Sequence, residues 1–256
     1  MDLPIDARAA QVEFLLHLGD TTLILAQRLV EWCGHGPALE EDMAVSNVAL
    51  DLIGQTRLWY GYAGELEGRG RSEDDLAFLR DAPLWRNLLL VELPNGNYAD
   101  TMVRQLLFDT WHYLFLEKLC ASSDARIAAI AAKSLKEVTY HARRSADLVV
   151  RLGDGTALSH ERTQDALERL WPYTGELFRD DAGDRLCAAA GWAPLRETLK
   201  APWQEHLARV LDEATLAMPT GEWMQEGGRR GRHTEHLGYI LAQMQFLQRA
   251  YPGAQW

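Results

Sequence analysis

The chain has 256 residues, of which 47% are hydrophobic and 25% charged, and its formal net charge is -11 at pH 7. This length allows a substantial hydrophobic core, and the negative charge disfavours nucleic acid and anionic membranes as general partners, since phosphate-rich surfaces attract basic faces. Three cysteines, Cys33, Cys120 and Cys187, are widely spaced with no Cys-x-x-Cys pair, so we expect reduced thiols and neither a disulfide framework nor a structural zinc site.

Targeting signals are not evident. The stretch 1–10 contains Asp2 and Asp6 and lacks a basic start followed by an apolar run, so we expect no secretory signal. No run of about 18 uninterrupted apolar residues occurs, which argues against a membrane span. Together with the reduced thiols, these features predict a cytoplasmic protein.

Apolar residues recur at the 3.6-residue spacing of amphipathic helices along most of the chain. The predicted helices span about 12–33, 38–62, 75–80, 83–92, 97–122, 125–153, 161–178, 202–215 and 234–251. The short turn at 34–37 makes the first two antiparallel neighbours. The charged stretch 64–75 predicts a solvated loop, Pro172 should bend or interrupt its helix, and 179–191 should hold a loop and a short helix.

A β-fold finds no support, because no window alternates apolar and polar residues for long and hairpin turn pairs are absent. Nor does the sequence show an internal repeat, a low-complexity tract or a change of composition that would mark a domain boundary. We therefore predict an all-α fold, a bundle of four long core helices plus additional C-terminal helices, forming a single domain over residues 1–256.

Two consecutive predicted helices carry carboxylate and imidazole side chains on their core-facing stripes. Asp109 and His112 are three residues apart, and Glu137 and His141 four apart, so each pair shares one helix face. The surrounding apolar residues place these faces toward the core. A buried carboxylate without a partner costs several kcal/mol, so these groups should meet a metal, a base or hydrogen-bond donors.

Such ligands in a helical bundle are typical of di-iron carboxylate proteins, which take a Glu from each of two helices and a Glu-x-x-His from each of two others. This chain departs from that pattern, since Asp109 replaces Glu, His141 comes one residue late and Gly54 stands three residues after Asp51, where His is expected. We interpret six positions as a degenerate metal site without metal: Asp51, Gly54, Asp109, His112, Glu137 and His141. A buried network in place of a metal centre and an iron or manganese site both remain open.

One concentrated positive segment precedes the last predicted helix. Its cationic and imidazole residues are Arg229, Arg230, Arg232, His233 and His236. Arginines in a glycine-rich stretch could hold phosphates or an acidic partner surface. A flexible solvated loop with Thr234 as helix cap is equally open. We reject zinc binding by the two histidines because no Cys or further His stands nearby.

Four strings of the sequence resemble one family. They are Leu18–His35, Leu50–Arg57, Leu88–Asn97 and His233–Gly238. These strings look like those of the C subunits of bacterial ring 1,2-phenylacetyl-CoA epoxidases, and the resemblance spans about residues 15–256. It implies a ferritin-like bundle within a multicomponent monooxygenase of phenylacetate catabolism.

The resemblance implies a structural, non-catalytic protein that pairs with the catalytic di-iron subunit of the epoxidase. NADPH, flavin and iron-sulfur groups belong to the reductase component, and no cofactor is expected on this chain. The Arg229–His236 segment is our expected contact with the di-iron subunit. The alternatives are a self-sufficient di-metal carboxylate oxygenase and a metal-binding ferritin-like protein.

The family also suggests contact with the CoA thioester substrate. We place such contacts at Leu84, Trp85, Arg86, Asn87, Arg185, Leu186 and Cys187. An aromatic ring beside an arginine suits an adenine or a phosphate, whereas ordinary packing of Trp85 into the core is the alternative.

Overall fold

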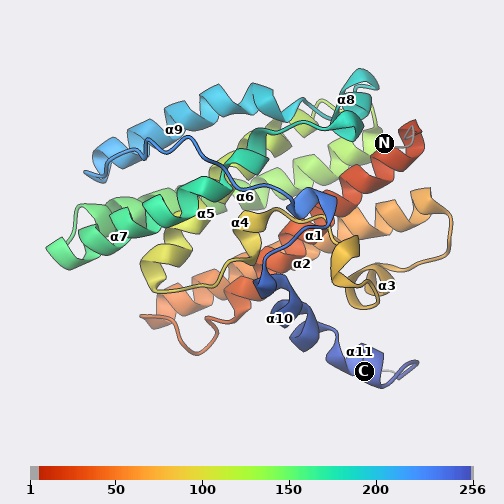
Figure 1. Cartoon of the computed structure of the whole chain (residues 1–256), viewed down its shortest axis with the longest axis horizontal. Helices are drawn as coiled ribbons and strands as arrows, with labels where there is room; N and C mark the ends of the chain where they lie inside the picture. The colour runs from red at the N-terminus through yellow and green to blue at the C-terminus, as the bar shows by residue number, and fades with distance from the viewer. Residues whose placement is uncertain (1–5, 255–256) are drawn as a thin grey trace. The chain divides into compact units, whose positions relative to one another are not determined.

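The computed structural model describes residues 6–254, which form helices and loops without a β-strand (Figure 1). The first five residues, which include Asp2 of the signal-peptide argument, and the last two lie outside the described part. The chain divides into two compact units: unit 1 comprises Met1–Pro94 with Gly227–Trp256, and unit 2 comprises Asn95–Glu226. The all-α class is confirmed, and the single domain stays a prediction. None of the described helices is long and apolar enough to cross a membrane.

Unit 1 is built on two long antiparallel helices, α1 (Ala7–Val30) and α2 (Leu39–Glu67), which pack along each other (Figure 1). Asp6 begins α1 by accepting a hydrogen bond from the backbone of the first turn. After α1 the chain turns through Gly34 at φ 80°. Gly68 ends α2 at φ 71°, a left-handed conformation that glycine adopts without steric cost.

The connection after α2 is shorter than the predicted loop 64–75, because α2 continues to Glu67 and α3 (Glu73–Phe78) begins early. Ser72 and Asp75 start α3 with a capping box in which each side chain bonds the other's backbone N–H. This local signal satisfies the free donors of the first turn, and it confines the loop to residues 68–72.

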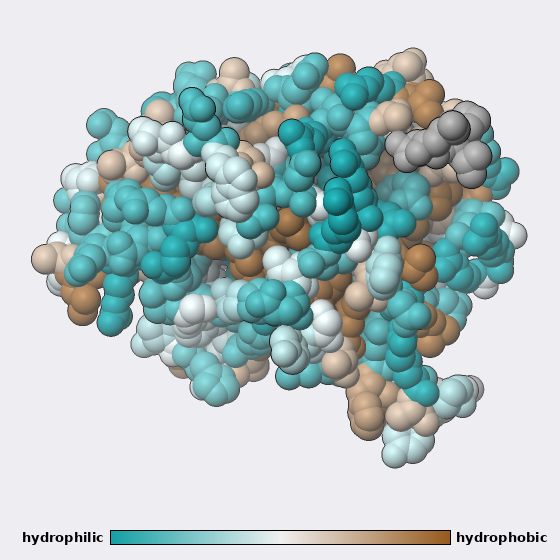
Figure 2. All heavy atoms as spheres, in the orientation of Figure 1, coloured by the Kyte–Doolittle hydropathy of each residue, from teal (hydrophilic) through white to brown (hydrophobic). Residues whose placement is uncertain are grey.

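Short elements complete unit 1. They are η1 (Ala82–Leu84), α4 (Leu89–Glu92), η5 (Gly228–Arg230), α10 (Glu235–Met244) and α11 (Phe246–Ala250). The last predicted helix is broken at Gln245, whose amide nitrogen donates to the carbonyls of Ala77 and Arg80 at 3.0 Å each. Figure 2 shows apolar side chains over these C-terminal helices, where Phe246 and Tyr251 are exposed.

Unit 2 contains four longer helices and several short ones. The helices are α5 (Tyr98–Leu119), α6 (Ala125–Gly153), α7 (Ala157–Leu170), η2 (Trp171–Tyr173), η3 (Gly175–Phe178), α8 (Ala182–Ala189), η4 (Arg196–Leu199) and α9 (Lys200–Glu213). Asn97 and Asp124 cap the starts of α5 and α6. Helix α7 ends at Leu170, because Pro172 lacks the N–H that would continue it. This confirms that Pro172 interrupts the predicted helix.

The core of unit 2 lies where α5 packs against α6, α7 and α9. The core-facing stripe predicted for α6 is largely confirmed: Glu137 on it is half-buried, whereas its other members are buried, namely Ile127, Ile130, Ser134, Val138, His141, Ser145 and Leu148. Trp203 of α9 is also buried, and its indole nitrogen donates to the carbonyl of Leu107 on α5 at 2.9 Å. A buried indole usually finds such an acceptor, and here the bond fixes α9 on α5.

The glycine-rich segment before α10 is packed rather than detached. A Cβ on Gly228 would clash with the carbonyl oxygen of Asn87, and one on Gly231 with the carbonyl oxygen of Pro83. Both obstacles are backbone atoms, which move less readily than the end of a side chain. The glycines are therefore required for the close approach of η5 to the segment preceding α4, so the segment is packed rather than flexible. The other part of that interpretation is confirmed, because the Thr234 hydroxyl caps α10 by accepting from the backbone N–H of His236 at 3.3 Å.

Replacing Gly228 by Ala should lower the free energy of unfolding by about 1 to 3 kcal/mol, the usual cost of forcing a methyl group into a filled space. Gly238→Ala is the matched control, because a Cβ there meets nothing within 4 Å and the position lies inside α10. That change should raise stability by up to about 1 kcal/mol. Urea titrations followed by circular dichroism measure both, and equal effects would contradict the close approach.

Candidate functional site

The polar cluster predicted for the two central helices is present in unit 2. Asp109 and His112 of α5 and His141 of α6 are all buried. The Oδ1 atom of Asp109 accepts a hydrogen bond from Gln105 Nε2 at 3.4 Å, and the carboxyl also bonds the hydroxyl of Ser145. The sequence therefore correctly predicted a carboxylate and two imidazoles at the core of these helices.

Burial dominates the electrostatics of this cluster. It raises the pKa of Asp109 from 3.8 to about 6, although the nearby charge of His141 and the Ser145 hydrogen bond act in the opposite direction. Burial, followed by the charge of His141, lowers the pKa of His112 from 6.5 to about 3. At neutral pH the cluster thus holds an Asp109 carboxylate and a neutral His112 ring.

The remaining predicted metal-site positions are less buried. Glu137 is half-buried on α6, and Asp51 and Gly54 lie on α2 of unit 1, with Gly54 exposed. Interpreting Gly54 as a metal-site position requires α2 to turn that residue toward the core, which is wrong, because the buried face of α2 carries Leu52 and Trp59 instead. The error arises because α2 has apolar residues on both faces, so that periodicity alone does not choose between them.

The donor set does not fit a di-iron centre. The buried cluster of α5 and α6 offers one carboxylate and two imidazoles, whereas the di-iron proteins use four carboxylates and two imidazoles. Among the described residues, no three His, Cys, Asp or Glu side chains gather so as to hold a metal ion. What the cluster can do is hold a charge and exchange a proton at the Asp109 carboxyl.

The first predicted CoA segment is mostly inaccessible. Trp85 and Asn87 are fully buried, while Leu84 is exposed and Arg86 is partly exposed. The indole nitrogen of Trp85 donates to the carbonyl of Arg80 at 3.3 Å, and the Arg80 guanidinium lies 4.6 Å from the centre of the indole ring. Trp85 is therefore a core residue, which confirms ordinary packing, the alternative to a CoA contact.

Arg86 lines a hollow of about 480 Å³ in unit 1. We call it the arginine hollow, after Arg8, Arg69, Arg71, Arg80 and Arg86, which face three acids, Asp6, Glu13 and Glu67. Glu67 pairs with Arg71 at 2.5 Å, and Glu13 pairs with Arg86 at 2.9 Å. Arg80 is already paired with the buried Asp20. The other four arginines face three acids, so the hollow carries a small excess of positive charge in a chain whose net charge is -11.

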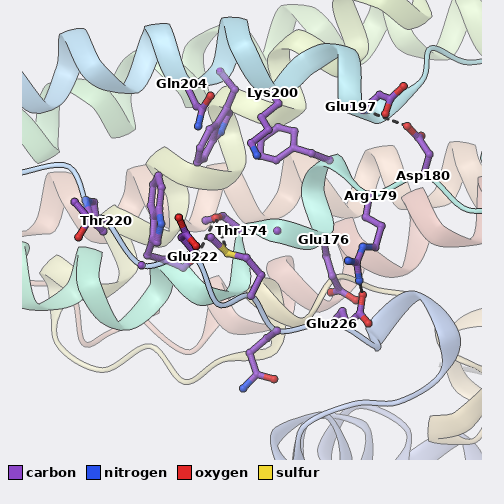
Figure 3. Close-up of a pocket in the computed structure, with 18 of the residues that line it drawn as sticks. Thr174, Glu176, Arg179, Asp180, Glu197, Lys200, Gln204, Thr220, Glu222 and Glu226 are labelled. Carbon is purple, nitrogen blue, oxygen red and sulfur yellow. Dashed lines mark hydrogen bonds and ion pairs between the residues drawn. The ribbon is translucent and has the colours of Figure 1, made fainter.

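The second predicted CoA segment lies on α8 of unit 2, where Arg185 is exposed and Cys187 is buried. Arg185 lines a hollow of about 750 Å³ that η3, α9 and residues 219–226 also form (Figure 3). Arg179 and Glu226 form an ion pair at this hollow. Asp180 accepts a hydrogen bond from the backbone of Glu197 at 3.1 Å.

The residues of the segment expected to contact the partner differ in how exposed they are. Arg230 and Arg232 are exposed, and Arg229 and His236 are partly exposed. The His233 side chain is almost fully buried, which removes it from a surface contact.

His233 is buried because of a set of hydrogen bonds around Glu92, which the sequence did not predict. The two ring nitrogens of His233 lie 3.1 Å from Glu92 Oε2 and 3.1 Å from the carbonyl of Trp85. Glu92 also accepts from the backbone N–H of Thr234 at 2.7 Å and from Asn87 Nδ2 at 3.1 Å. These bonds fasten the start of α10 to α4.

A second buried network was also missed. Asp20 on α1 pairs with Arg80, accepts from the Tyr60 hydroxyl at 2.5 Å and accepts from the backbone N–H of Arg86 at 2.7 Å. Burial, followed by the charge of Asp20, raises the pKa of Tyr60 well above its usual value, so the phenol keeps its proton and donates. The one signal in the sequence was an aspartate inside the apolar run of the first helix.

The long helices and the buried cluster of Asp109, His112 and His141 define an all-α helical-bundle protein whose donor set departs from the di-iron pattern. The chain belongs to the family of phenylacetic acid catabolic proteins, whose match covers residues 1–256. It is 49% identical over 243 residues to the C subunit of the 1,2-phenylacetyl-CoA epoxidase of Escherichia coli (strain K12), covering 95% of this chain and 98% of that protein. The resemblance seen in the four strings is confirmed, and a ferritin-like fold fits this family.

Asp109→Asn should change how stability depends on pH. Because the folded-state pKa of Asp109 is raised from 3.8 to about 6, its favourable contribution is fully present below about pH 4 and is lost as pH rises through 6. The variant lacks this loss, so its stability relative to the parent should increase from pH 4 to pH 8, by at most about 3 kcal/mol.

Urea titrations at both pH values measure this difference, with Asp147→Asn, a carboxylate on the outer side of α6 that is less buried than Asp109, as the control for charge alone. His112 acts in the opposite sense, since its lowered pKa gives a contribution that is present above pH 6.5 and lost as pH falls through 3. This His112 contribution is the same in parent and variant, so it cancels from the difference in stability between them. A difference independent of pH would show that Asp109 ionises as freely as in the unfolded chain.

Proposed function

We propose that this chain is the non-catalytic structural subunit of a phenylacetyl-CoA ring 1,2-epoxidase in aerobic phenylacetate degradation. It pairs with and stabilises the di-iron oxygenase subunit in the cytoplasm. The observation that carries this proposal is the 49% identity to the C subunit of such an epoxidase along almost the whole of both chains. The di-iron centre then belongs to the partner, and NADPH, flavin and iron-sulfur groups belong to the reductase component.

The buried cluster supports the non-catalytic role. Asp109 is engaged by Gln105, Ser145 and the charge of His141, so the carboxylate that would have to bind iron already has donors around it. A network of this kind stabilises the folded state only while every member remains paired. On this proposal the cluster is a structural replacement for a metal centre.

Metal content and reconstitution test this function. Expressed alone with iron supplied, the chain should contain far less than one iron. It should bind the di-iron oxygenase subunit, and its presence should be needed for epoxidation of phenylacetyl-CoA. Asp109→Asn in this chain should leave the turnover of the assembled complex unchanged, because on this proposal the buried cluster takes no part in the chemistry. Near two irons per isolated chain, with turnover, would instead make it a self-sufficient oxygenase, and iron without turnover would make it a metal-binding protein.

We further propose that this chain contacts the phosphate groups of the CoA thioester through the arginine hollow. Arg86 belongs both to the segment expected to bind CoA and to the hollow. Arg69 stands at the rim with its side chain exposed, 3.6 Å from Glu67. Guanidinium groups bind phosphate through paired N–H donors, and the excess of arginines over acids supplies the charge.

Calorimetry with CoA and with pantetheine, which lacks the phosphates, tests this contact. Arg69→Ala should weaken CoA binding several-fold and reduce its dependence on salt, because a single exposed charge contributes modestly. The control is Arg162→Ala, an exposed arginine on α7 of unit 2. Equal affinity for pantetheine and CoA would rule out a phosphate contact while leaving the structural role untouched.

A further inference from the structure

The outer face of α6 carries a row of cations that the proposed function does not explain. Four basic side chains on this face are exposed: Lys133, Lys136, Arg143 and Arg151. Together with the exposed Tyr140 they recur at helical spacing, so they lie along one side of α6. At 1.5 Å per residue the row is about 27 Å long. We call these five residues the α6 stripe.

The cations of the α6 stripe are not neutralised by other described residues. Within residues 6–254, none of the four side chains forms a hydrogen bond or an ion pair. Asp147 lies on the same side, four residues from both Arg143 and Arg151, and pairs with neither. Glu137, four residues after Lys133, is half-buried on the core-facing stripe instead. Four cations and the single carboxylate of Asp147 give this face a net charge of +3, in a chain whose net charge is -11.

An exposed tyrosine stands at the centre of the α6 stripe. Tyr140 exposes 51% of its surface, with Lys136 four residues before it and Arg143 three residues after it. Tyrosine and arginine are enriched among the residues that dominate the binding energy of protein interfaces. A face that served solubility alone would gain nothing from an exposed aromatic ring. The stripe therefore has the composition of a protein contact.

The layout of the α6 stripe distinguishes among anionic partners. Recognition of one phosphate takes converging donors, whereas these cations stand in single file. A helix that binds a membrane inserts its apolar face, but the apolar face of α6 lies in the core of unit 2. A nucleic acid extends beyond the stripe and would be repelled by the rest of an acidic chain. A row of separate charges fits the separate carboxylates of an acidic polypeptide.

We propose that the α6 stripe binds an acidic segment of a partner protein, which lies along the helix with an aromatic or apolar side chain against Tyr140. Charge complementarity of this kind accelerates association and selects the partner. A second copy of the chain fits less well, because the stripe does not complement itself and a head-to-tail contact forms open chains unless its rotation closes. The proposal goes beyond the proposed function and does not depend on it.

Fluorescence anisotropy of the whole chain with labelled poly-L-glutamate tests the cations. Binding should weaken as salt rises from about 0.02 M to about 0.15 M, because screening shortens the reach of exposed charges. One triple variant removes three cations of the stripe: Lys133→Gln, Lys136→Gln and Arg143→Gln. Its matched control removes two lysines and one arginine that are exposed on other helices of unit 2: Lys118→Gln, Lys200→Gln and Arg162→Gln.

The stripe variant should bind poly-L-glutamate about tenfold more weakly than the parent, and the control variant should bind as the parent does. Glutamine keeps a high helix propensity, and circular dichroism melting curves establish that both variants are folded. Absence of binding at low salt, or an equal loss of affinity in the two variants, overturns the proposal.

A copolymer of glutamate and tyrosine tests the aromatic centre. It should bind the parent several-fold more tightly than poly-L-glutamate does, since paired aromatic rings attract each other. Tyr140→Ala should remove this advantage, and Tyr239→Ala, at an exposed tyrosine of α10, should keep it. An advantage that survives Tyr140→Ala contradicts the proposed contact.

The same variants separate the acidic polypeptide from other partners. Tighter binding of duplex DNA or of phosphatidylserine vesicles than of either polymer, lost in the stripe variant, overturns the proposal. So do oligomers of the chain alone, seen by sedimentation velocity, that the stripe variant abolishes, because the stripe would then belong to a second copy.

Discussion

The buried ion pair between Asp20 and Arg80 is the interaction on which the arrangement of unit 1 depends. Removing one member would leave a buried charge without its partner, at a cost of about 3 to 5 kcal/mol. Asp20 also binds Tyr60 of α2 and the backbone of Arg86. One carboxylate therefore fixes α1, α2 and the segment after α3. Gly19 permits this, because a Cβ there would clash with the Tyr60 ring.

The consequences extend along unit 1 to its C-terminal part. Arg80 stacks on Trp85, the carbonyl of Trp85 meets His233, and His233 meets Glu92. A continuous set of polar contacts thus holds residues distant in sequence, and it leaves Arg86 at the edge of the arginine hollow. The proposed CoA contact at Arg86 lies beside this ordered frame, and a surface binds more tightly when it is already ordered.

In unit 2 the buried carboxylate has different partners from those of Asp20 in unit 1. Asp109 has an amide, a hydroxyl and an imidazole near it, rather than the guanidinium pair of Asp20. Its pKa near 6 follows from burial that these partners only partly offset. The cluster holds one carboxylate and two imidazoles, fewer carboxylates than a di-iron protein uses. It also makes the charge of the cluster sensitive to mild acid.

The sequence by itself determined the helices, because their hydrogen bonds, caps and apolar period lie within a few residues of each other. It located α5 and α6 to within three residues and identified Asp109, His112 and His141 as core groups. Only the tertiary structure decided which side of α2 is buried, since both sides are apolar and packing made the choice. It alone paired Asp20 with Arg80 and Glu92 with His233, because such partners lie 60 and 141 residues apart and the folding of the chain, rather than any local pattern, brings them together.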